Sequence, residues 1–143
     1  MFARLAAATV AGGITFFVLG FLVYGLFLGP VLILPNSIEY TGLMKPEPMW
    51  IPLVLGYFVA ALLLAYIFEK WAGIRTFVGG LYGGVVVWFL ITLSNQMMFL
   101  AFWNIDKNHI PVFADLLGSI IVGGLAGGVI GMVLGMMDKK AAA

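Results

Sequence analysis

The sequence predicts an all-α integral membrane protein, a bundle of four helices that each cross the bilayer. Of its 143 residues, 64% are hydrophobic and only 9% are charged, which is too little polar cover for a soluble domain. Four apolar stretches reach the roughly 20 residues that a membrane-spanning helix needs. These stretches are too long for barrel strands, and backbone groups in hydrocarbon must pair internally, so each stretch is expected to be a helix.

The first apolar stretch, residues 5–28, follows Arg4. It is too long for the hydrophobic core of a signal peptide and lacks a small-residue cleavage site, so we expect a permanent span. A long outer loop, residues 29–49, should follow. In this loop Asn36 is suited to cap a short interfacial helix ending near Gly42, with Glu39 reaching back to the cap. An irregular loop with one turn is the alternative.

Three further spans are expected over residues 50–68, 76–103 and 111–137. Proline normally interrupts a helix beyond its first turn, and every proline falls in a predicted outer loop or in the first turn of a span that follows one. These prolines are Pro30, Pro35, Pro46, Pro48, Pro52 and Pro111. No room remains for a soluble domain, so residues 1–143 are predicted to form a single transmembrane domain.

The distribution of Lys and Arg predicts the orientation. Cytoplasmic loops carry an excess of these residues. With the N-terminus inside, five of the seven lie on the cytoplasmic side and two on the outer side. The cytoplasmic set is Arg4, Lys70, Arg75, Lys139 and Lys140, and the outer set is Lys45 and Lys107. Both termini are therefore predicted to be cytoplasmic. Glu69, Lys70 and Arg75 flank the short turn between the second and third spans, where we expect a solvated surface ion pair.

Rows of small residues are the strongest pattern in the chain. The fourth span carries five at a constant spacing of four, and the third span carries a shorter row beside an offset pair, Gly80 and Gly84. The two rows are Ser119, Gly123, Gly127, Gly131, Gly135 and Gly79, Gly83. Residues four apart share a helix face, so each row predicts close helix packing. The packing is either inside one bundle or between subunits, while a glycine-lined pore would lack polar lining.

Polar residues gather toward the outer side of the last two spans. Asn95 and Gln96 end the third span, and Asp115 and Ser119 begin the fourth. An antiparallel hairpin would place Asn95 and Ser119 at similar depth, with Asp115 about 6 Å nearer the surface. An ionisable group within a span is a functional candidate, suited here to a proton, a cation or a polar headgroup. Two tyrosines at comparable depth complete the candidate set, Tyr24 and Tyr57. Alternatively, Asp115 meets a helix dipole and interfacial water, and the tyrosines are interfacial anchors.

The sequence lacks the residues that metal binding, haem ligation, common catalytic motifs and nucleic-acid binding require. The chain has no cysteine and one histidine, His109 in a loop, so neither a metal site nor paired haem ligation is expected. No motif surrounds a serine nucleophile, and no phosphate-binding glycine loop is present. No basic run suits nucleic acid. We therefore expect no enzyme and no cofactor, although a flat apolar carotenoid or quinone fits beside glycine without any motif.

The stretch Leu19-Gly20-Phe21-Leu22-Val23-Tyr24-Gly25, the Gly-rich third span and the Asp115-containing start of the fourth resemble an uncharacterised family of small bacterial four-span membrane proteins. In that family a Trp-Tyr-Gly element often closes the first helix, where this chain has Val23. The resemblance implies the four-span fold in a bacterial inner membrane, and it implies no known activity.

These observations favour a non-enzymatic membrane protein that packs through its glycine-rich helix faces. It would act within membrane lipid as a homo-oligomer or as an accessory subunit of a membrane complex. The alternative is a small transporter, or a protein that binds lipid or a small molecule, using the outer polar cluster.

Overall fold

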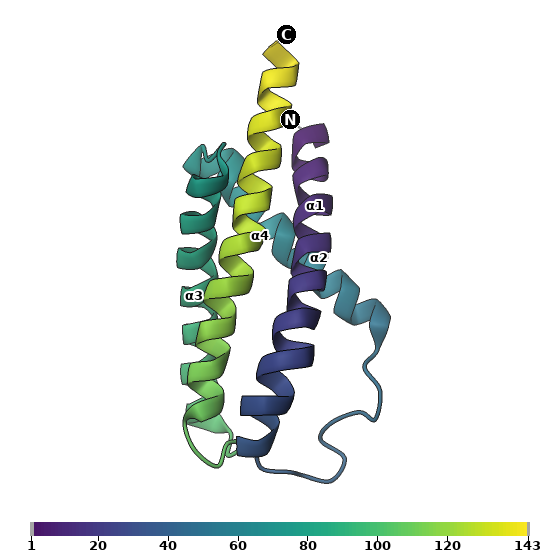
Figure 1. The fold of residues 1–143 in the computed structure, drawn as a ribbon, viewed down its shortest axis with the longest axis vertical. Helices are drawn as coiled ribbons and strands as arrows, with labels where there is room; N and C mark the ends of the chain where they lie inside the picture. The colour runs from purple at the N-terminus through teal and green to yellow at the C-terminus, as the bar shows by residue number, and fades with distance from the viewer. Residues whose placement is uncertain (1, 143) are drawn as a thin grey trace.

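The computed structural model describes residues 2–142, which form helices joined by two short connections and one long loop, residues 37–49 (Figure 1). Met1 and Ala143, which the predicted domain includes, lie outside the described residues. Four stretches are long and apolar enough to cross a membrane, which confirms the predicted all-α membrane bundle. The elements in chain order are α1 (Phe2–Gly20), η1 (Phe21–Ile33), η2 (Leu34–Asn36), α2 (Trp50–Ile67), η3 (Phe68–Ala72), α3 (Phe77–Phe102) and α4 (Ile110–Ala142).

The first span continues well beyond residue 28, where the sequence led us to expect a loop. The π-helix η1 and the 3-10 turn η2 extend it to Asn36. Pro30 lies inside η1, and the Leu34 N–H donates to the carbonyl of Gly29, five residues back. Five-residue spacing is that of a π-helix, whose wider turn departs from the α-helical pattern that proline disrupts. The prediction that every proline lies in an outer loop or in the first turn of a span that follows one is therefore wrong at Pro30, and also at Pro35, which lies in η2.

Asn36 ends a helix and does not begin one. Its side-chain amide donates to the Leu32 carbonyl at 2.8 Å, and the Ser37 hydroxyl donates to the Ile33 carbonyl at 2.8 Å. Both acceptors lie four residues back, so these side chains satisfy carbonyls that the end of a helix leaves unpaired. The expected interfacial helix after Asn36 is absent from the structure, and the chain turns instead at Gly42, where φ is +81°.

The two connections at this end of the bundle are tied to each other by backbone hydrogen bonds. Ser37 forms an isolated antiparallel bridge with Asp106. The Ile38 N–H donates to the Ile105 carbonyl at 2.7 Å, and the Lys107 N–H donates to the Asn36 carbonyl at 2.8 Å. We call this end of the bundle the loop end. The opposite end, where both chain termini lie (Figure 1), is called the terminal end.

The helices pack in the order α2, α1, α4, α3, with α2 crossing diagonally behind α4 and α1 (Figure 1). Helix α2 contacts α1 where the two cross, because the Tyr57 and Phe58 rings occupy the space beside Gly20 and Gly13 of α1. The largest fully buried side chains are Phe16, Phe68, Leu64, Ile130, Leu134 and Ser119, and all of them except Ser119 lie at mid-bundle or toward the terminal end. The core is therefore densest away from the loop end.

Helices α3 and α4 touch through glycine. A Cβ added to Gly127 would overlap with the Gly80 carbonyl oxygen and lie 2.7 Å from the Gly84 Cα. A Cβ at Gly131 would lie 3.0 Å from the Gly80 Cα. Gly123 likewise lies against Trp88 of the third span, and Gly135 lies against Arg75 in the segment before it. The row on the fourth span is thus occupied within the chain.

The third-span glycines contact two different parts of the chain. Gly80 and Gly84 meet the backbone of α4. Gly79 and Gly83 do not face α4, because their nearest neighbours are Thr76, Ile74 and Phe68 in the connection from α2. Ser119 is fully buried, and its hydroxyl donates to the Leu116 carbonyl of its own helix at 2.7 Å.

Candidate functional site

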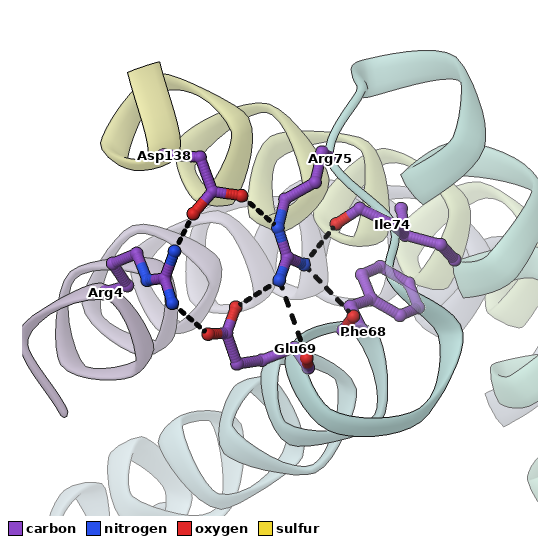
Figure 2. Close-up of polar contacts among 6 residues, drawn as sticks. All are labelled: Arg4, Phe68, Glu69, Ile74, Arg75 and Asp138. Carbon is purple, nitrogen blue, oxygen red and sulfur yellow. Dashed lines mark hydrogen bonds and ion pairs between the residues drawn. The ribbon is translucent and has the colours of Figure 1, made fainter. Parts of the chain in front are cut away.

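Four charged residues from four parts of the chain meet at the terminal end (Figure 2). Arg4 comes from the first turn of α1, Glu69 from η3, Arg75 from the segment before α3, and Asp138 from the last turns of α4. We call them the ionic network. No two of them are adjacent in sequence, so only the fold brings them together.

The ionic network is a closed ring of alternating charge. Arg4 Nη2 lies 2.9 Å from Glu69 Oε1, and Arg75 Nη2 lies 2.8 Å from Glu69 Oε2. Both arginines also pair with Asp138, Arg75 through its Nε at 2.5 Å. Two positive and two negative groups leave no net charge. The Glu69 side chain is only 4% exposed, whereas the two arginines are 29% and 26% exposed.

Arg75 also closes the end of the second helix. Its Nη1 donates to the carbonyls of Ile74 at 2.9 Å and Phe68 at 3.2 Å. The chain reverses after η3 at Gly73, whose φ of +61° is the left-handed conformation that glycine adopts readily. A cation next to the last carbonyls of a helix is stabilised by the helix dipole. The turn therefore fixes the Arg75 guanidinium between Glu69 and the backbone.

The ionic network is more buried than the solvated surface ion pair that we expected among Glu69, Lys70 and Arg75. Lys70 is exposed and outside the network, and Arg4 and Asp138 take part instead. Removing one partner from a buried pair leaves an uncompensated charge and costs about 3–5 kcal/mol. Part of the signal for this site was available in the predicted topology, since Arg4, Glu69 and Arg75 were expected on the same side of the membrane, and Asp138 directly precedes Lys139, which was expected there too.

At the loop end, three of the six predicted site residues come together. Gln96 Nε2 of α3 donates to Asp115 Oδ2 of α4 at 2.6 Å. The Tyr24 hydroxyl of η1 donates to the Asp115 backbone carbonyl at 3.0 Å. The Tyr24 ring lies against Gly118, where an added Cβ would be 2.5 Å from the ring. This arrangement connects η1, α3 and α4 through one residue.

The other three predicted site residues lie elsewhere. Asn95 is exposed, and its side chain forms no hydrogen bond with any described residue. The Ser119 hydroxyl is used within α4. Tyr57 packs against α1, with its ring 5.9 Å from that of Phe17 in an edge-on arrangement. The structure therefore divides the predicted cluster into one contact group and three separate side chains.

The acidic residues and the histidine do not form a metal-binding cluster among the described residues. Over residues 2–142, no three such side chains lie close enough together to hold an ion. An open hollow lies beside the turn between α3 and α4, lined by residues 99–100 and 103–109.

Compared with protein-family models, with curated proteins and with solved structures, the chain matches none. The resemblance to small bacterial four-span membrane proteins thus gains no support and carries no further argument.

Proposed function

We propose that this multi-pass membrane protein is not an enzyme and works by assembling in the bilayer, as a homo-oligomer or as an accessory subunit of a membrane complex. The observation that supports the proposal is the poor coverage of α3. Only Gly80 and Gly84 are buried among its 26 residues. Because the glycine row of α4 is filled by these residues, the proposed assembly surface is the uncovered part of α3 and not the glycine row.

The depth of Asn95 makes this exposure costly. Helix α3 has 26 residues, so it is about 39 Å long, against a hydrocarbon core of about 30 Å. Asn95 precedes the last residue, Phe102, by seven positions, or about 10 Å. A centred α3 therefore holds its amide within the hydrocarbon. An amide without a partner there costs roughly 1–3 kcal/mol, and a neighbouring helix that pairs with it would offset this cost.

The first test is gentle extraction of the protein from its native membrane, followed by native mass spectrometry and an absorbance spectrum of the same fraction. We expect further copies of the chain or other membrane subunits in the particle. A monomer carrying only lipid, under conditions that preserve known complexes of the same membrane, would overturn the proposal. Visible absorbance would reveal a bound pigment.

A second candidate function is transport, or binding of a lipid or small molecule, at Asp115. It is favoured by a carboxylate whose described hydrogen-bond partner is neutral, the Gln96 amide. The test compares lipids and small molecules that copurify with the wild type and with Asp115→Asn. Glu47→Gln, in the exposed connection after η2, is the matched control. Loss of a ligand in Asp115→Asn alone would support this function, and identical ligands in all three proteins would exclude it.

We also propose that both termini face the cytoplasm of a bacterial cell, with the protein in the inner membrane. The proposal rests on the distribution of Lys and Arg, which favours the terminal end as the cytoplasmic side.

A further inference from the structure

We propose that two copies of this chain pair through the loop-end half of α3, around a hydrogen bond between their Asn95 side chains. The inference rests on the proposed assembly function and names a second copy as the partner. We call the contact surface the α3 face. It consists of Thr92, Asn95, Phe99 and Phe102, which are spaced three or four residues apart and therefore lie on one side of the helix.

The α3 face is uncovered because of how α2 packs. One turn before it on the same side of α3, Trp88 lies against Phe16 of α1, with ring centroids 4.8 Å apart. Beyond Trp88, Thr92 is half-buried and Asn95 is exposed, and Phe99 and Phe102 are 46% and 78% exposed. Helix α2 crosses behind α1, so that its loop-end half lies on the far side of α1 from α3 (Figure 1). The position beside the α3 face is therefore vacant within one chain.

The bilayer makes a second copy a suitable occupant. All copies of a membrane protein cross in the same direction, so two copies pair about a two-fold axis along the membrane normal. Such an axis places each residue near its own equivalent at the same depth. An Asn amide both donates and accepts, so two Asn95 side chains can satisfy each other. Lipid chains offer neither a donor nor an acceptor.

The remaining residues of the α3 face agree with this symmetry. The face carries no charged residue, so a two-fold axis opposes no like charges. Phe99 and Phe102 supply aromatic area on the loop-end side of Asn95, and aromatic pairs pack well across such an axis. Gln96, the adjacent amide, is already bound to Asp115, which leaves Asn95 to pair outside the chain.

The absence of cysteine from the sequence allows a direct test in native membranes. Phe99→Cys retains Asn95 and places one thiol on the α3 face. Met97→Cys is the matched control, since Met97 is 49% exposed at similar depth but about 200° around the helix. Disulfide formation requires a Cα separation below about 7 Å. We expect an oxidised dimer of Phe99→Cys and little or none of Met97→Cys.

A second measurement tests the role of the amide. Dimer affinity is measured in lipid by dilution and energy transfer between labelled copies. Asn95→Leu should weaken pairing by about three- to thirtyfold, the range given by measured polar contacts between membrane helices. Ser94→Ala, at an exposed neighbouring position, should leave the affinity unchanged. Unchanged affinity of Asn95→Leu would overturn the inference.

The outcomes separate this inference from the proposed function. Crosslinking of Phe99→Cys to copies of the chain supports both. If other membrane subunits copurify while the two cysteine variants form equal amounts of dimer, or none, the chain is an accessory subunit and the self-pairing is wrong. A monomer without any partner overturns both.

Discussion

Replacing Gly127 by alanine should destabilise the monomer, although alanine is the better helix former. The substitution gains about 1 kcal/mol of helix propensity. The new Cβ, however, would overlap with the Gly80 carbonyl oxygen and lie 2.7 Å from the Gly84 Cα, whereas carbon atoms pack at about 3.5–4.0 Å. These neighbours are backbone atoms that cannot rotate away, so α3 and α4 must separate by about 1 Å. Overpacking of this kind costs about 1–3 kcal/mol and occasionally more.

The assay is reversible unfolding in mixed micelles with increasing denaturing detergent, followed by helical circular dichroism. Gly56→Ala in α2 is the matched control, because no atom lies within 4 Å of its added Cβ. We expect Gly56→Ala to be neutral or stabilising by up to about 1 kcal/mol, and Gly127→Ala to be destabilised by up to about 2 kcal/mol net. Equal stability of the two variants would refute the close α3 and α4 contact. If Gly127→Ala reduced association between subunits without lowering monomer stability, the glycine row would lie at a subunit interface.

Three other predictions concern the two ends of the bundle. Glu69→Gln should lower stability by roughly 3 kcal/mol, because it leaves two arginines facing one carboxylate. Lys70→Gln, at the exposed neighbouring position, should change stability by less than about 0.5 kcal/mol. Equal effects of the two variants in detergent unfolding would contradict the ionic network. Tyr24→Phe should cost about 1 kcal/mol by removing the bond to the loop-end carbonyl, and Tyr82→Phe, at an exposed ring, should cost nothing by the same assay. An impermeant maleimide should label Lys45→Cys in intact cells and Lys70→Cys only after permeabilisation, and the opposite pattern would reverse the proposed orientation.

The fold was predictable because lipid imposes strict demands on a backbone. Each of the four long apolar stretches can pair its backbone N–H and C=O groups within the bilayer by forming a helix. The extension of the first helix through Pro30 was not predictable from the same rules, since proline ordinarily ends a helix. Whether a π-helix forms there depends on tertiary contacts such as that between Tyr24 and Asp115, which a local pattern does not contain.

Approximate depth could be read from the sequence, but direction around the helix axis could not. Counting residues from the loop placed Asn95 level with Ser119 and put Asp115 about 6 Å nearer the surface, whereas the structure pairs Asp115 with Gln96, the residue after Asn95. Asn95 lies at the same level but about 100° around α3, and it is exposed. The ionic network was missed for a related reason. Each charged residue was interpreted within its own segment, while the pairing of Arg4 with Asp138 spans nearly the whole chain.

The two ends of the bundle should act independently, and this can be measured. The ionic network joins all four spans at the terminal end, whereas the α3 face lies at the loop end, with about 27 Å of helix between Phe77 and Asn95. Sites more than about 10 Å apart without shared partners usually contribute additively. Glu69→Gln should therefore lower monomer stability and leave dimer affinity unchanged, and Asn95→Leu should do the reverse. In the double variant the two effects should sum within about 0.5 kcal/mol. A larger deviation would mean that pairing at the loop end is coupled through α3 to the ionic network, so that assembly controls how firmly the terminal end is closed.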